Sequence, residues 1–185
     1  MEFSKRDPTV TATYYILLNQ KRTPRLLSNS KQFTFVSGHK VKKSTTKSTY
    51  EGHSFDIGLV QNQIQTNIHR QLAKEFGEKN VGTEIDTGYG SQIDVVVREN
   101  DRGFVFYEIK TSYSVRLCIR EALAQLLEYA YYPKSSNAKK LIIVSPNAVT
   151  QEAKSYLKFI RESFDIPVYY QRYNPEKEVL ENIMH

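Results

Sequence analysis

The sequence predicts a mixed α/β fold in which helices cover both faces of a mixed β-sheet. Two observations support this prediction. Apolar residues recur at helical spacing across residues 58–76 and 115–132. Short apolar or alternating runs follow these stretches, at residues 92–97, 104–110 and 140–145. The expected order is therefore helix, three strands, helix, strand, helix and strand.

The first helix is expected over residues 58–76. Its apolar residues advance by about one helical turn at a time, and Gly77 supplies a stop signal. The apolar stripe consists of Leu59, Val60, Ile64, Ile68, Leu72 and Phe76. A first strand is expected over residues 80–85, and a turn over residues 87–91 leads into the second strand.

The second half of the chain alternates helices with strands. A helix is expected over residues 115–132, and a short apolar run over residues 140–145 is typical of a buried strand. Thr150 is expected to cap a helix over residues 151–164, and a final strand follows over residues 167–173. The stripe expected to be buried on the first of these helices is Val115, Ile119, Leu123, Leu126 and Ala130.

The positive charge is concentrated in the N-terminal quarter. Residues 1–50 hold ten Lys and Arg against two acidic residues, whereas the whole chain has a net charge of +6. We therefore expect a basic N-terminal extension over residues 1–50, with short strands at 11–18 and 32–36, and one domain over residues 51–185.

The basic extension contains candidates for nucleic-acid binding. Lys40, Lys42 and Lys43 lie in a Thr- and Ser-rich stretch that is expected to be a loop. Such a cluster is typical of a surface that binds a phosphate backbone. A solvated leader segment would explain the same charge equally well, so both interpretations stay open.

The remaining composition is that of a soluble globular protein. Apolar residues make up 39% and charged residues 25% of the 185 residues. No apolar run approaches the ~20 residues of a membrane span, and the N-terminus lacks the apolar core of a signal peptide. Cys118 is the single cysteine, which excludes an internal disulfide and fits a reducing cytoplasm. Its apolar helical surroundings favour a buried structural thiol over a nucleophile.

The most informative stretch is a pair of adjacent strands that carry charged residues. Asp94 lies on the second expected strand, and Glu108 and Lys110 lie on the third. Because strand side chains alternate between faces, Glu108 and Lys110 share a face while Ile109 points into the fold. A hairpin at residues 99–103 would bring all three charged side chains to one patch.

The same alternation applies to the second strand. Asp94 is expected to share a face with Gln92 and Val96, while Ile93 and Val95 face the other way. An Asp inside an apolar strand is disfavoured, and burying it without a partner costs several kcal/mol. A bound cation, a lysine or a helix N-terminus would offset that cost.

The chemistry of the patch indicates a divalent cation. Asp94, Glu108 and the backbone carbonyl of Ile109 are hard oxygen ligands of the kind that Mg²⁺ or Mn²⁺ prefers. Lys110 would hold the attacking water or pair with a scissile phosphate. The alternative is a surface Asp beside an ordinary Glu108–Lys110 ion pair.

The helix after the third strand carries further candidates. Gln125 and Tyr129 are one turn apart on a polar stripe, where they would contact a phosphate or hold Lys110 in place. Arg116 and Arg120 form a second polar row near the start of this helix. They would contact a nucleic-acid backbone or lie in solvent.

These features together resemble the PD-(D/E)XK phosphodiesterase superfamily, which has the restriction-endonuclease-like fold, over about residues 58–173. Asp94 matches the metal-binding Asp on the second core strand of that family. Glu108-Ile109-Lys110 matches its (D/E)-x-K motif on the third. The helix with Gln125 and Tyr129 is similar to the Gln-x-x-x-Tyr signature of RecB-like nucleases.

Two positions depart from the pattern of this family. Gln65 lies on the first helix, where family members often place a further carboxylate, and it is the candidate for the equivalent position. Ile93 replaces the usual proline before the Asp. The first departure leaves the number of bound cations open.

The resemblance implies an αβββαβ core with an additional C-terminal helix and strand. It also implies a Mg²⁺- or Mn²⁺-dependent DNA nuclease, expected to be an endonuclease, in which water attacks the phosphodiester in line. We expect a role in restriction, phage defence, repair or recombination, in a prokaryotic cytoplasm or encoded by a phage. Residues 1–50 would contact DNA, form a homodimer or dock a partner subunit, and no membrane is expected as a partner.

Two other functional classes stay open. The first is a non-catalytic nucleic-acid-binding or scaffold subunit that retains the nuclease fold. The complete set of Asp94, Glu108 and Lys110 argues against it, and the missing carboxylate on the first helix argues for it. The second is a metal-free α/β protein in which these groups form an internal ion pair.

Overall fold

The computed structural model describes residues 33–41, 57–99, 103–134 and 138–185, which all belong to one compact unit, Lys31–His185. The helices are α2 (Ile57–Phe76), α3 (Val115–Tyr131) and α4 (Gln151–Phe164), with a 3₁₀ helix η1 (Glu78–Asn80). The strands are β1 (Val81–Asp86), β2 (Gln92–Arg98), β3 (Phe104–Ile109), β4 (Ala138–Ser145), β5 (Val168–Asn174) and β6 (Val179–Met184). None of the helices in these ranges has the length and apolar content that crossing a membrane requires.

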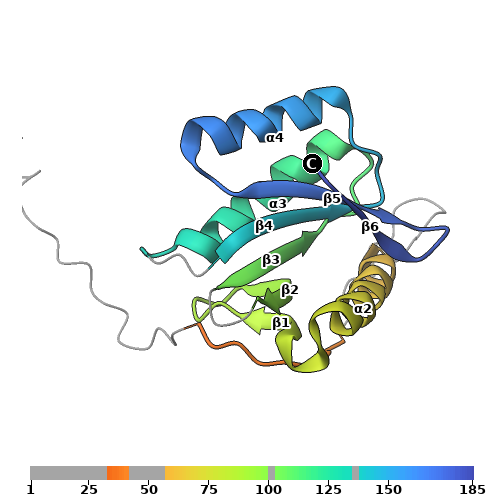
Figure 1. Ribbon diagram of the computed structural model, residues 1–185, viewed down its shortest axis with the longest axis vertical. Coiled ribbons are helices and arrows are strands. Elements are labelled where there is room, and N and C mark those ends of the chain that lie inside the picture. The colour runs from red at the N-terminus through yellow and green to blue at the C-terminus, as the bar shows by residue number, and fades with distance from the viewer. Residues whose placement is uncertain (1–32, 42–56, 100–102, 135–137) are drawn as a thin grey trace, which may run out of the picture. The chain divides into compact units, whose positions relative to one another are not determined.

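The six strands form one mixed sheet whose spatial order is the order of the chain. Strands β1, β2 and β3 pair antiparallel, β3, β4 and β5 pair parallel, and β6 returns antiparallel to β5. Helices α3 and α4 connect the parallel strands (Figure 1). The predicted mixed α/β class with helices around a mixed sheet is therefore confirmed, and β6 is an addition that the sequence pattern does not predict.

Helix α2 covers one face of the sheet. Ile64, Ile68 and Leu72 are buried there against side chains of the central strands, so this part of the predicted stripe is confirmed. The helix ends at Phe76 because Gly77 adopts φ 89°, which glycine reaches without steric strain. The buried strand residues of this face are Val81, Val95, Val97, Val105, Tyr107, Ile109, Ile142, Val144, Tyr173 and Leu180.

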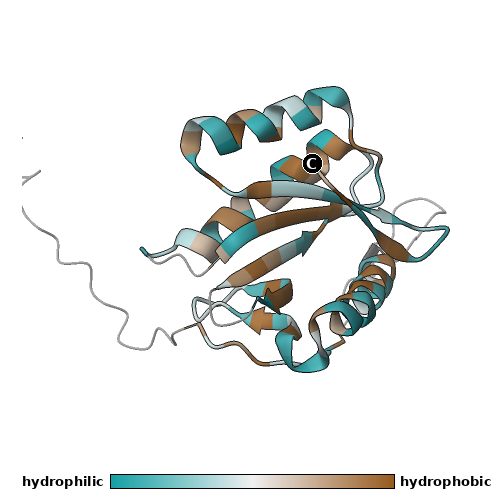
Figure 2. Cartoon of the chain, in the orientation of Figure 1, coloured by the Kyte–Doolittle hydropathy of each residue, from teal (hydrophilic) through white to brown (hydrophobic). Residues whose placement is uncertain are grey.

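Helices α3 and α4 cover the opposite face (Figure 1). Each begins at an N-cap residue, and the one predicted from the sequence, Thr150, is confirmed. Ser114 Oγ accepts a hydrogen bond from Leu117 N–H at 3.3 Å, and Thr150 Oγ1 accepts one from Ala153 N–H at 3.2 Å. Figure 2 shows that the central strands are mostly apolar, whereas the helices alternate between apolar and polar turns. The buried helix residues of this face are Val115, Cys118, Ile119, Ala122, Leu126, Ala130, Ala153, Leu157 and Ile160.

Two residues of the predicted stripes lie outside the core. Leu59 and Val60 are exposed, whereas Phe76 and Leu123 are half-buried and pack against the core. The first two belong to the turn before Gln61, and Gln61 already reaches the carbonyl of Ile109 at the end of β3. Among the described strands, none covers Leu59 and Val60 at the start of α2.

The segment at residues 33–41 lies along the edge strand β1. The strand predicted for residues 32–36 is absent over the described residues 33–36, and Gly38 instead forms a single bridge with Gly82. The bridge brings the two backbones so close that a Cβ on Gly82 would lie 2.3 Å from the carbonyl oxygen of Val36. Glycine is therefore required at position 82. The strand predicted at residues 11–18 lies outside the described residues.

A histidine pair fastens this segment to α2. The ring of His39 stacks on that of His69, with 5.0 Å between centroids. His39 also forms hydrogen bonds through Nε2 with Thr66 Oγ1 at 3.1 Å and through Nδ1 with Thr83 Oγ1 at 3.3 Å. These contacts join the segment, α2 and β1.

The histidine pair predicts a loss of stability in acid. Burial and the Arg70 charge lower the pKa of His39 against an opposing effect of Glu84. Burial and the charge of His39 lower the pKa of His69, opposed by Glu78. Because each folded pKa lies below the ordinary value of 6.5, the unfolded chain binds more protons in mild acid. The stabilising contribution is therefore complete above that value and is lost as the pH falls through the lowered pKa values.

We expect urea unfolding to give a lower free energy of unfolding at about pH 5.5 than at about pH 7.5. Replacing both imidazoles, as His39→Gln with His69→Phe, is expected to flatten this dependence, because neither replacement side chain can be protonated. An unchanged slope in the double variant would contradict the assignment.

Candidate active site

Asp94 and Glu108 lie on neighbouring strands at the junction of β2 and β3. The antiparallel register pairs Val95 with Tyr107, so its continuation places Asp94 opposite Glu108. Both residues are 2% exposed. Asp94 Oδ2 accepts a hydrogen bond of 2.8 Å from the N–H of Ile109. The Asp94 side chain is thus held by the backbone of β3, next to Glu108.

Lys110 directs its ammonium group to the same place. Its Nζ lies 2.8 Å from Glu108 Oε1, and its side chain is 17% exposed. Its backbone N–H continues the pairing of β3 with β4 by donating to Val144 O at 2.9 Å. Ile109, between the two charged residues, packs into the core under α2. The alternation expected for Glu108, Ile109 and Lys110 is therefore observed.

Helix α3 places the phenol of Tyr129 near the two carboxylates. Tyr129 OH accepts a hydrogen bond of 3.2 Å from Gln125 Nε2, so the pair singled out in the sequence is in contact. Burial raises the pKa of Tyr129, and the negative charges of Glu108 and Asp94 raise it further. Tyr129 is therefore close enough to respond to both carboxylates, and it stays protonated at neutral pH.

Two glutamines of α2 reach the site from the opposite face. Gln61 Nε2 donates to Ile109 O at 2.8 Å. Gln65 Nε2 donates to Glu84 Oε1 at 2.7 Å and to the carbonyl oxygen of Asp94 at 3.0 Å. Gln65 is 2% exposed, and its Oε1 accepts no hydrogen bond within the described ranges. The residue expected to replace a helix carboxylate thus holds the backbone at Asp94.

Glu84 is a buried acidic residue that the sequence analysis missed. It is 5% exposed and lies on β1, beside Asp94 on β2. Its φ of 51° is left-handed, an uncommon conformation for a residue other than glycine. The available signal was an acidic residue inside an apolar strand, which is the argument that singled out Asp94.

The alternation predicted for β2 is wrong at this position. Ile93 packs in the core under α3 and α4, whereas Val95 packs in the core under α2. The pairing of β1 with β2 passes from Thr83–Val95 directly to Ile85–Ile93. The left-handed backbone of Glu84 lies at this gap. Ile85 and Ile93 on one side of the gap therefore face the core under α3 and α4, whereas Val95 on the other side faces the core under α2.

The donor set suits a hard cation in part. Asp94, Glu108 and Ile109 offer oxygen atoms only, which matches the preference of Mg²⁺ and Mn²⁺. Lys110 already engages one oxygen of Glu108, and Gln61 engages the carbonyl of Ile109. Within residues 33–41, 57–99, 103–134 and 138–185, no group of three or more His, Cys, Asp or Glu side chains is gathered for a metal.

The other basic candidates lie apart from these carboxylates. Arg116 and Arg120 are exposed and line a groove between α3 and α4. Lys40 is exposed, and its backbone forms hydrogen bonds with the hydroxyl of Thr83. Lys42 and Lys43 lie outside the described residues, so their predicted role stays a prediction.

The two hydrogen bonds of Gln65 predict a specific cost of replacing it. Gln65→Leu removes the donor for Glu84 and for the carbonyl of Asp94, and we expect a loss of about 1–3 kcal/mol in the free energy of unfolding by urea. Gln63→Leu is the matched control, because Gln63 is exposed on the same helix. Equal stability of the two variants would contradict a holding role for Gln65.

Comparison with known proteins adds no assignment for this site. No protein-family model, no curated protein and no solved structure matches the chain. The functional argument therefore depends on the chain's own residues and their geometry.

Proposed function

We propose that the chain is a metal-dependent DNA nuclease with the restriction-endonuclease-like fold. The observation that carries this proposal is the meeting of Asp94, Glu108 and Lys110 at the junction of β2 and β3. The order of helix, three antiparallel strands, crossover helix and parallel strand supports the same assignment. In this proposal the chain cleaves phosphodiesters internally, in restriction, phage defence, repair or recombination.

The two carboxylates and the Ile109 carbonyl would hold one Mg²⁺ or Mn²⁺. Magnesium commonly keeps several waters and uses only one or two protein carboxylates together with substrate phosphate. Asp94 and Glu108 therefore suffice without a third acidic ligand. When bound, the cation would supply positive charge against the scissile phosphate and lower the pKa of the attacking water.

The fixed geometry of the protein side chains supports this chemistry. The Ile109 N–H holds Asp94 in one orientation, so little reorganisation is needed when charge develops. Lys110 provides a partly exposed ammonium group that would turn from Glu108 toward a phosphate oxygen. Tyr129, kept protonated by burial and by the two carboxylates, would donate a hydrogen bond, with Gln125 orienting its hydroxyl.

A specific observation also favours a second candidate function. Lys110 Nζ and Glu108 Oε1, 2.8 Å apart, form an ion pair between two side chains of the chain itself. A non-catalytic nucleic-acid-binding or scaffold subunit would use this pair to offset part of the cost of burying the carboxylate. Cleavage and cation binding separate the two candidates.

The first prediction for the nuclease is cleavage that depends on three side chains. We expect plasmid DNA to be cut in Mg²⁺ or Mn²⁺ and to stay intact in EDTA. Asp94→Asn, Glu108→Gln and Lys110→Met are each expected to reduce the rate by about 10²-fold or more, because the first two remove a ligand of the cation and the third removes positive charge at the reacting phosphate. Asp86→Asn is the control, because Asp86 is an exposed carboxylate on β1. Equal rates for Asp94→Asn and Asp86→Asn would refute the proposed site.

The second prediction concerns cation binding without DNA. A cation that binds only the folded chain stabilises it by about 2.7 kcal/mol at about 100 times its Kd. We therefore expect Mn²⁺ to raise the thermal midpoint of the wild type and of Asp86→Asn, but not that of Asp94→Asn. Stabilisation without cleavage would favour the scaffold subunit, and the absence of both would favour the metal-free ion pair.

A further inference from the structure

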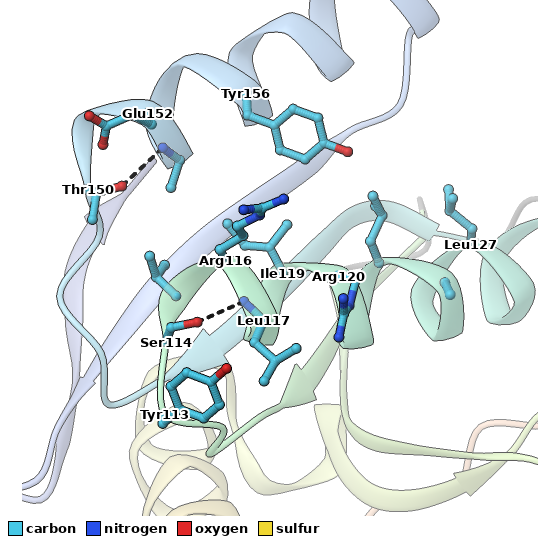
Figure 3. A pocket seen from close by; sticks show the side chains of 14 residues that line it. Tyr113, Ser114, Arg116, Leu117, Ile119, Arg120, Leu127, Thr150, Glu152 and Tyr156 are labelled. Carbon is cyan, nitrogen blue, oxygen red and sulfur yellow. Dashed lines mark hydrogen bonds between the residues drawn. The ribbon is translucent and has the colours of Figure 1, made fainter.

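An open groove lies between α3 and α4, on the side of the molecule away from α2 (Figure 3). Its volume is ≈ 1210 Å³. Leu117, Leu123 and Leu127 line it from α3 and are only half-buried. Helix α3 therefore carries a second apolar stripe, in addition to the one that packs on the sheet.

Exposed aromatic residues border this groove. Tyr113 is 89% exposed and Tyr156 is 49% exposed, and both belong to the groove lining. Figure 3 shows Tyr156 on α4 and Tyr113 before α3, with Arg116 and Arg120 on α3. Tyrosine and arginine around half-buried leucine is the composition of a protein–protein interface rather than of an ordinary solvated surface.

The charged residues of the groove are complementary but separate. Arg116 and Arg120 on α3 and Glu152 on α4 are all exposed. None of the three takes part in an ion pair within the described part of the chain. Hydrogen bonds at the start of α4 lower the pKa of Glu152, so this carboxylate is ionised at neutral pH.

We propose that this groove binds a second copy of the chain in a two-fold dimer. In a two-fold interface each protomer presents the same surface to the other, so α3 of one protomer faces α4 of its partner. Arg116 and Arg120 of each protomer then meet Glu152 of the other, and the leucines and tyrosines are covered. A nucleic acid satisfies this surface less well, because its phosphates would repel Glu152 and leave the leucines exposed.

The proposed interface is independent of the candidate active site. Asp94, Glu108, Lys110 and Tyr129 do not line the groove. The proposed dimer therefore does not depend on nuclease activity. The interface assigns Arg116 and Arg120 to a protein partner instead of to DNA.

Reversing the charges tests the arrangement. We expect the wild type to sediment as a dimer at low ionic strength, and the variants Arg116→Glu/Arg120→Glu and Glu152→Arg to sediment as monomers. Each variant places like charges against each other in both halves of the interface. We expect an equimolar mixture of the two monomeric variants to form a heterodimer, because both halves then regain opposite charges.

The control is Lys74→Glu, which changes an exposed charge on α2, and we expect it to stay dimeric. Circular dichroism verifies that all variants keep the wild-type fold. The proposal would be overturned if the wild type were monomeric or if either charge-reversal variant remained dimeric. It would also be overturned if the mixture of the two variants formed no heterodimer. Binding of an oligonucleotide that is lost only in Arg116→Glu/Arg120→Glu, with no dimer in the wild type, would also overturn it. The sedimentation measurement contains neither cation nor DNA, so its outcome is separate from that of the nuclease assay.

Discussion

The hydrogen bond from the Ile109 amide to the Asp94 carboxylate is the contact on which the rest of the candidate site depends. It places a side chain of β2 where strand pairing would otherwise continue, and it satisfies part of a buried carboxylate. Ile109 lies between Glu108 and Lys110 along β3. The hydrogen bond therefore holds the stretch of backbone from which both charged side chains extend.

The two layers of helices support this junction in different ways. From one face, α2 contributes side-chain amides, and Gln61 and Gln65 hold the carbonyls of Ile109 and Asp94. From the other face, α3 contributes Tyr129, whose pKa responds to the two carboxylates. The glutamines thus satisfy backbone carbonyls beside the buried acids, whereas the Asp94 and Glu108 carboxylates are partnered by the Ile109 N–H and by Lys110.

Much of the fold follows from periodicity. The boundaries of α2, α3, α4 and the first five strands agree with the sequence to within a few residues, and the contact between Glu108 and Lys110 follows from strand alternation. Alternation fails at Ile93 and Val95 because the left-handed backbone at Glu84 is a tertiary feature without a sequence signal. β6 escapes prediction because its apolar residues, Val179, Leu180, Ile183 and Met184, do not alternate with polar ones, and of these only Leu180 is buried. The stacking of His39 on His69 joins residues far apart in the chain, which local pattern cannot reveal.

The bridge between Gly38 and Gly82 has a consequence for the behaviour of the sheet in solution. An outermost strand normally offers unpaired amides and carbonyls to strands of other molecules. Here Gly38 N–H donates to Val81 O, and Thr83 N–H donates to Gly38 O. The flanking segment thereby occupies the free side of β1 around Gly82, so the backbone groups of Val81 and Thr83 are not offered to a strand of another molecule.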